Sequence, residues 1–84
     1  MSSTDLRSER FVIEGRVDHA TFPDWIDRHA RKLGIFCGPI EAQGNTVTFS
    51  AEGAPDMLDA MEMGCSLGPI TVDVRRIDRR ILTE

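Results

Sequence analysis

Two cysteines and two histidines are the residues of this chain that could bind a metal ion. Cys37, Cys65, His19 and His29 would suit zinc by type, because thiolates and imidazoles are ligands that zinc prefers. Their spacing does not support a site, since the sequence has no Cys-x-x-Cys and no His-x₃-His pair. We therefore expect no metal, no cofactor and two free thiols in a reducing compartment.

Paired carboxylates and a run of arginines are the other groups that could do chemistry. Asp24 and Asp27, like Asp59 and Glu62, stand three residues apart, which places each pair on one face of a helix. Solvated helix faces explain these pairs more simply than acid–base catalysis does. A basic cluster near the C-terminal end consists of Arg75, Arg76, Arg79 and Arg80, interleaved with Asp73 and Asp78. We interpret it as charge that protects a terminal strand from pairing with other chains, with docking of an acidic partner or an anion as the alternative.

The first two elements that position these groups follow from hydrophobic periodicity. Apolar and polar residues alternate over residues 10–17, which predicts a half-buried strand. A helix is expected over residues 22–33, opened by Thr21 and Asp24 as a capping box. Gly34 stands where a helix commonly ends in the left-handed conformation.

A hairpin is expected next. Residues 35–42 predict an edge strand or a bulged strand, because Gly38-Pro39 interrupts them. The turn signal Gln43-Gly44-Asn45 then leads into a strand with clear alternation over residues 46–51.

The last two predicted elements are a helix and a strand. The helix begins at Pro55 and ends near residues 64–67. The strand alternates from Ile70 to Val74, and Ile77 breaks that alternation, which indicates a bulge or a strand end near Arg76. The resulting order predicts a ferredoxin-like α+β fold (split βαβ, βαββαβ), with a four-stranded antiparallel sheet and two helices on one face.

Length and charge limit the class of protein. A chain of 84 residues is enough for one domain, and a net charge of −4 argues against a nucleic-acid partner. No apolar run reaches the ~20 residues that a membrane span needs, and no signal peptide is recognised. We expect a cytoplasmic monomer without a membrane partner. Residues 1–9 are expected to be a flexible tail and residues 10–84 the single domain.

Three segments, in the same order along the chain as in the acylphosphatase family, resemble that family and together cover nearly the whole domain. The resemblance implies that residues 10–84 are an acylphosphatase-like domain. The segments are Phe11-Val12-Ile13-Glu14-Gly15-Arg16-Val17 with Phe22 after a short loop, Ala30-Arg31-Lys32-Leu33-Gly34-Ile35, and Gly68-Pro69-Ile70-Thr71-Val72-Asp73-Val74. The resemblance implies a phosphate cradle made of main-chain amides in the loop after the first strand. It also implies an arginine directly after the phenylalanine, an asparagine on the second strand that orients water, and an acyl phosphate as substrate. The anion-binding candidates that it implies are Arg16, Asp18, His19, Ala20, Thr21 and Phe22.

The sequence departs from the family at the residues that carry its chemistry. Pro23 occupies the arginine position and supplies neither a guanidinium nor an N–H group. Counting from Gly34, the asparagine position falls at Glu41, or at Ala42 if the register slips by one. A carboxylate at this position would repel a phosphoryl group. Two glycine positions of the loop fall at His19 and Thr21, whose Cβ atoms restrict positive φ.

These departures leave three hypotheses. The first is a non-catalytic module that binds a small anion such as phosphate, or a protein, and has no confident catalytic residue. The second is an active acylphosphatase in which His19 and Arg16 replace the missing arginine and Glu41 orients or deprotonates water. The third is a structural interaction domain without a ligand. A solvated histidine and a strand-surface arginine remain the simpler interpretation of His19 and Arg16.

Overall fold

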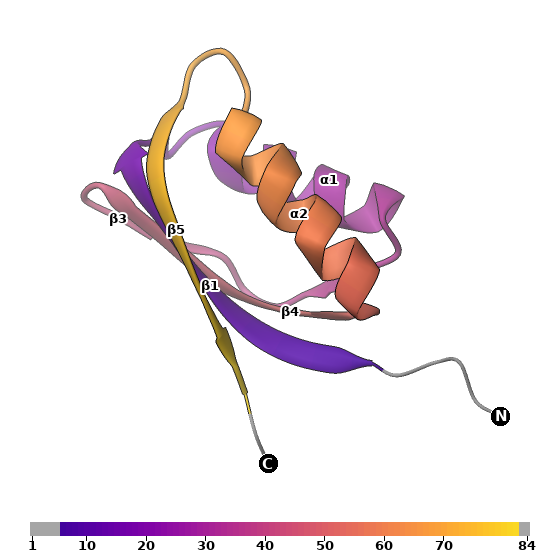
Figure 1. The fold of residues 1–84 in the computed structure, drawn as a ribbon. Coiled ribbons are helices and arrows are strands. Elements are labelled where there is room, and N and C mark those ends of the chain that lie inside the picture. Colours follow the sequence, from indigo (N-terminus) through magenta and orange to yellow (C-terminus); the bar gives the residue numbers. More distant parts are fainter. Residues whose placement is uncertain (1–5, 83–84) are drawn as a thin grey trace, which may run out of the picture.

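The computed structural model describes residues 6–82, which form two helices and five strands. In chain order the elements are β1 (Arg7–Arg16), α1 (Phe22–Lys32), β2 (Phe36–Cys37), β3 (Glu41–Gln43), β4 (Thr46–Gly53), α2 (Pro55–Leu67) and β5 (Asp73–Ile81). The strands form one antiparallel sheet in the order β2-β4-β1-β5, with β3 also paired to β4. Both helices cover one face of the sheet and leave the other face open (Figure 1). The predicted ferredoxin-like fold is therefore confirmed.

The number of strands differs from the four that were predicted, because the strand expected over residues 35–42 is divided into β2 and β3. β2 and β3 both pair with β4, and the residues between them include Pro39, which has no N–H group to donate to a ladder. Gly38 still donates its main-chain N–H to the carbonyl of Ser50 at 2.9 Å. The expected interruption at Gly38-Pro39 thus gives five strands where the sequence predicted four.

The hydrophobic core lies between the helices and the covered face of the sheet. Phe11 on β1 and Phe49 on β4 are cross-strand partners, and their rings stack with centroids 5.1 Å apart. The buried apolar side chains are Phe11, Ile13, Phe22, Ile26, Ala30, Ile35, Val47, Phe49, Ala51, Leu58, Met61 and Cys65. Within residues 6–82, neither helix combines the length and the apolar character that crossing a membrane requires.

The domain begins earlier than the sequence indicated. β1 starts at Arg7, so residues 7–9 belong to the sheet and the predicted tail over residues 1–9 is too long. Tertiary pairing explains the difference, because Glu9 has cross-strand partners on both sides, Ala51 on β4 and Ile81 on β5. Residues 1–5 of the predicted tail and residues 83–84 of the predicted domain lie outside the described residues.

The last strand also runs over different residues from those expected. β5 covers Asp73–Ile81, whereas the alternation predicted a strand from Ile70 to Val74. Ile70 is fully exposed in the loop after α2. β5 extends far past Val74 because the long β1 supplies paired residues as far as Glu9.

A bulge interrupts the pairing of β1 with β5. Glu14 pairs with Arg76 and Gly15 pairs with Val74, so Arg75 is the extra residue. Gly15 has φ = +150°, and a Cβ atom there would collide with a main-chain carbonyl oxygen of β5. The sequence indicated a bulge or strand end near Arg76, and the structure decides for the bulge.

The two helices touch where a histidine of α1 meets a glycine of α2. A Cβ atom on Gly64 would collide with the ring of His29, so the absence of a side chain allows this approach. Trp25 stacks on the His29 ring with centroids 5.0 Å apart, whereas Gly64 approaches the Nε2 edge of the ring. Nε2 of His29 is buried without a hydrogen-bond partner in the described part of the chain. His29 is therefore a packing residue that contacts both Trp25 and Gly64.

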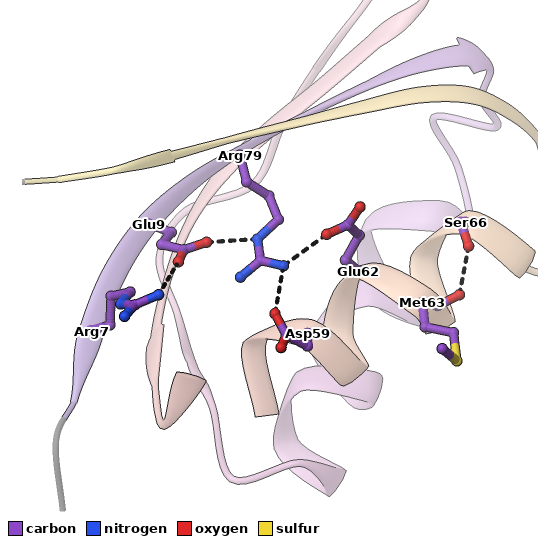
Figure 2. A network of polar contacts seen from close by, with 7 residues as sticks. All are labelled: Arg7, Glu9, Asp59, Glu62, Met63, Ser66 and Arg79. Atoms are coloured by element: carbon purple, nitrogen blue, oxygen red, sulfur yellow. Dashed lines mark hydrogen bonds and ion pairs between the residues drawn. The ribbon is translucent and has the colours of Figure 1, made fainter. Parts of the chain in front are cut away.

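An ion-pair network joins α2 to strands β1 and β5 (Figure 2). Arg79 on β5 turns toward the helix layer and donates from Nε to Glu9 on β1 at 2.6 Å. Its Nη1 atom donates to Asp59 at 2.9 Å and to Glu62 at 2.7 Å, both on α2. These hydrogen bonds, with Glu9 contributing most, raise the pKa of Arg79 above its ordinary value. The guanidinium carbon also lies 5.3 Å from the centre of the Phe11 ring.

Candidate anion-binding site

The loop between β1 and α1 folds around the side chain of Asp18. Its Oδ1 atom accepts the main-chain N–H of Ala20 at 2.9 Å, and Oδ2 accepts the hydroxyl of Thr21 at 2.9 Å. The main-chain carbonyl of Asp18 accepts the N–H of Phe22 at 2.9 Å. This arrangement is an Asx turn, in which a short carboxylate takes up main-chain donors close in sequence.

The Asp18 carboxylate is held in its charged form. The hydroxyl of Thr21 and then the N–H of Ala20 lower its pKa from the usual value. At neutral pH, therefore, the loop already contains a negative charge, and two of its donors already serve an anion of the chain itself. An incoming anion would have to displace this carboxylate and would also be repelled by it.

Thr21 stands at the N-cap position of α1, as the sequence predicted, and its main-chain carbonyl accepts the N–H of Trp25 at 3.0 Å, but the predicted side-chain capping box is not formed. The Thr21 side chain accepts no capping hydrogen bond from α1, and its hydroxyl donates to Asp18. The helix still begins at Phe22, which is fully buried, and Pro23 stands in its first turn. Trp25 lies over this start, with its ring centre 5.8 Å from that of Phe22.

His19 is turned toward the turn between β3 and β4. Its Nε2 atom lies 2.7 Å from the carbonyl oxygen of Gly44, and since a carbonyl can only accept, Nε2 carries the proton in this contact. The bond ties the β1–α1 loop to the neighbouring turn. It leaves Nδ1 as the ring atom available to a ligand.

Glu41 lies away from this loop. It pairs with Thr48, which stands between the buried residues Val47 and Phe49, so both Glu41 and Thr48 face the open side of the sheet. There Glu41 lines a hollow with Arg10, Pro39, Thr48, Phe49 and Ser50. Within residues 6–82, no hydrogen bond or ion pair links Glu41 to the Asp18–Phe22 loop.

Arg16 belongs to another hollow on the open face, at the end of β1. This hollow is lined by Glu14, Gly15, Arg16, Asn45, Thr46 and Arg75. It adjoins the loop through the β3–β4 turn, because Gly15 donates its N–H to the carbonyl of Asn45 at 3.0 Å and His19 contacts Gly44. Asn45 was not recognised as a site residue from the sequence, and Arg75 was named only within the basic cluster, for which docking of an acidic partner or an anion was the alternative interpretation. The break of alternation at Ile77 was the signal that could have led to Arg75.

The predicted site residues thus fall into two places. Asp18, Ala20, Thr21 and Phe22 form one hydrogen-bonded turn, whereas Arg16 lies in the adjoining hollow. In the part of the chain that the structure describes, no three His, Cys, Asp or Glu residues gather in positions that could hold a metal ion. An anion in the hollow would meet the arginine, amide and hydroxyl groups of its lining together with the carboxylate of Glu14.

Comparison with solved structures identifies the fold. The chain matches an acylphosphatase from Coxiella burnetii with a TM-score of 0.87 and 15% identity, over 99% of this chain and 90% of that one. An acylphosphatase from Bacillus subtilis matches with a TM-score of 0.83 and 20% identity, over 95% and 88% of the two chains. The fold is that of the acylphosphatases.

A third similar structure is full-length HypF in its phosphate- and nucleotide-bound form. It matches 96% of this chain with a TM-score of 0.84 and 15% identity, and the match covers 11% of HypF. No protein-family model and no curated protein sequence matches the chain. At these identities the likeness establishes the acylphosphatase fold, and the chemistry has to be argued from the residues.

Proposed function

We propose that this chain is a non-catalytic module with the acylphosphatase fold, which binds a small anion or a protein and hydrolyses little or no acyl phosphate. The observation that carries this proposal is the Asp18 carboxylate, which accepts hydrogen bonds from Ala20 and Thr21 inside the loop. The family resemblance assigns to this loop the donors that hold the substrate phosphate. Here a side chain of the protein takes them.

The magnitude of the losses supports the same conclusion. Removing one preorganised donor from a catalytic site costs about 2.7–4 kcal/mol, or roughly 10²–10³ in rate. Pro23 stands at the position of the family's arginine and Glu41 at that of its asparagine, which removes two such groups. Together these losses amount to about 10⁴-fold or more in rate, before the repulsion from Asp18 is counted.

Hydrolysis of benzoyl phosphate by the purified chain tests the proposal. We expect the wild type to match a control without protein, because no guanidinium stabilises the phosphoryl group at the loop. Pro23→Arg and Pro23→Gln form a matched pair, since both remove the proline and only the first adds a guanidinium. Activity that appears in Pro23→Arg alone would support the assignment of the missing arginine to this position. Wild-type turnover well above the control would contradict the proposal.

An acylphosphatase with altered residues is the second candidate, and the solved acylphosphatases of the same fold favour it. In that case Arg16 and His19 would supply the positive charge, and Glu41, which lies away from the loop in this structure, would have to approach it to orient or deprotonate water. The same assay separates the two candidates. Turnover by the wild type that is lost in His19→Ala, with the fold intact, would support the hydrolase.

The proposal extends to partners and location. A net charge of −4 and the free thiols Cys37 and Cys65 support a monomer in a reducing, cytoplasmic environment without a nucleic-acid or membrane partner. A structural interaction domain would behave differently. Light scattering behind size-exclusion chromatography should then show a mass that rises with concentration, whereas the proposed module should keep the mass of a single chain.

A further inference from the structure

The hollow at the end of β1 gathers positive charge on the open face of the sheet. Arg16 contributes the last side chain of β1, and Arg75 contributes the extra residue of the bulge in β5. Without the bulge, strict alternation from Arg76 would turn Arg75 toward the helices. The bulge, which requires glycine at position 15, therefore places Arg75 beside the hollow that Arg16 also lines, although Arg75 borders a second hollow with Glu62 and Ser66 of α2 as well.

Neither Arg16 nor Arg75 forms an ion pair with another described residue. Among residues 6–82, the ion pairs within 4 Å involve Arg7, Arg31, Arg76 and Arg79. Asp73 is the cross-strand partner of Arg16 by backbone register, yet the two side chains form no ion pair. Two guanidiniums beside one hollow repel each other unless an anion lies between them.

Neutral hydrogen-bonding groups complete the lining. The side-chain amide of Asn45 and the hydroxyl of Thr46 belong to it, and both can donate to an oxyanion. The hydrogen bond from Gly15 to the carbonyl of Asn45, 3.0 Å long, holds this turn against the end of β1. The donors therefore stand on paired strands and on a turn fastened to them.

Glu14 is the one carboxylate in the lining, and it limits which anion can bind. A carboxylate accepts hydrogen bonds and donates none, so it repels an anion whose oxygens are all unprotonated. It stabilises an anion that keeps a hydroxyl group, because that group can donate to it. Inorganic phosphate keeps a P–OH group at neutral pH, whereas sulfate has none and a phosphomonoester loses its last proton at a pKa of about 6.

We propose that this hollow binds inorganic phosphate, with Arg16 and Arg75 on its charged oxygens and Glu14 accepting its P–OH proton. The site is separate from the β1–α1 loop, where Asp18 already takes donors. The inference rests on the proposed anion-binding function and names its site and ligand.

A titration of the full chain followed by ¹H–¹⁵N NMR tests the proposal. Sodium phosphate, sodium sulfate and methyl phosphate are added at pH 7.5 and constant ionic strength. We expect saturable phosphate shifts at the amides of Gly15, Asn45 and Thr46 and at the side chain of Arg75. Sulfate and methyl phosphate should bind about tenfold more weakly or worse. Equal, non-saturating shifts with all three salts would overturn the proposal.

Substitutions assign the roles within the hollow. Arg16→Gln and Arg75→Gln should each weaken phosphate binding about tenfold or more, because each removes a charged hydrogen-bond donor. Arg28→Gln is the matched control, since it removes the same charge from an exposed position on α1 and should leave the affinity unchanged. Glu14→Gln should improve sulfate binding and reduce the preference for phosphate toward unity. A preference that survives Glu14→Gln would refute the role of this carboxylate.

The outcome remains separable from that of the hydrolysis assay. Turnover of benzoyl phosphate would remove the non-catalytic assignment, while saturable shifts at Asn45 and Arg75 would still establish the phosphate site. Shifts confined to residues 18–22 would instead show that phosphate displaces Asp18, and would overturn the site proposed in the hollow. The dispersion of each variant's spectrum reports whether it is folded.

Discussion

Replacing Arg79 by methionine should destabilise the domain more than any other single arginine substitution on the sheet. Arg79 donates at 2.6 Å to Glu9, of which only 3% is exposed. Methionine keeps an apolar stem of similar length and removes the charge, so Glu9 would keep only the ion pair with Arg7 at 3.5 Å. The substitution therefore leaves the buried carboxylate of Glu9 without its main hydrogen-bond donor.

The cost can be worked out from the exposure of each partner. Removing one partner of a buried ion pair costs about 3–5 kcal/mol, and we take the lower end because 18% of the Arg79 side chain is exposed. Asp59 and Glu62 are 71% and 41% exposed, so their ion pairs add at most about 1 kcal/mol each. We expect a loss of about 3 kcal/mol, which lowers the melting temperature of a domain of this size by about 12–24 °C.

Urea unfolding followed by the fluorescence of Trp25, the single tryptophan, measures this loss. Glu9→Gln added to Arg79→Met should recover at least half of it, because the buried charge is then gone. Arg76→Met is the matched control on the same strand, since its partner Asp78 is exposed and the cost should stay below about 1 kcal/mol. A loss below about 1 kcal/mol for Arg79→Met, or no recovery in the double variant, would refute the reasoning.

Three further predictions concern packing, backbone conformation and the thiols. Gly64→Ala should destabilise the domain by about 1–2 kcal/mol in urea unfolding, because overpacking against His29 outweighs the gain of about 1 kcal/mol in helix propensity. In a His29→Ala background the same substitution should stabilise the domain, because the ring that it would overpack is gone. Gly15→Ala should lower the free energy of unfolding by about 3 kcal/mol or more, since its φ of +150° and the collision with β5 both exclude a Cβ atom. Gly44→Ala, at a position with open space around it, should lower it by less. Burial raises the pKa of Cys37 to about 11 and that of Cys65 to about 12, so a thiol reagent at pH 8 should label both slowly until urea unfolds the chain. The unfolded thiols ionise near pH 9 and the folded ones do not, so the contribution of the two thiols to the free energy of unfolding is complete below pH 9 and is lost between pH 9 and about 12. A free energy of unfolding that is independent of pH over that range would contradict this prediction.

The fold could be predicted because its signals are local. Alternation around Phe11 and Phe49 marks the two long paired strands, and helical spacing around Ile26 and Leu58 marks the helices. Each of these residues is buried as its pattern requires. The ends of the elements were predicted less well, because they depend on pairing. β1 extends back to Arg7 because Arg7 pairs with Gly53 of β4, and β5 extends to Ile81 because Ile81 pairs with Glu9 of β1.

The candidate site was predicted only in part, for the same reason. The sequence located the loop with Asp18 and the substitutions at Pro23 and Glu41, because these are read by counting along the chain. It did not indicate that the Asp18 carboxylate takes the donors of Ala20 and Thr21, since the capping-box pattern assigned Thr21 to the helix. A capping box uses the Thr21 oxygen as an acceptor, whereas the geometry of the loop uses the Thr21 hydroxyl as a donor to Asp18.

By itself, the sequence determined which residues alternate between core and solvent, where glycine and proline end an element, and so the order of strands and helices. Tertiary structure alone decided which arginines meet which partners. Arg75 and Arg79 look alike in the sequence. Arg75, the extra residue of the bulge, lines a hollow with Arg16, whereas Arg79 donates to Glu9, 70 residues away in the chain. The physical reason is that the period of a strand fixes only the alternation of its side chains. The register, the bulges and the neighbouring elements then determine what each face meets.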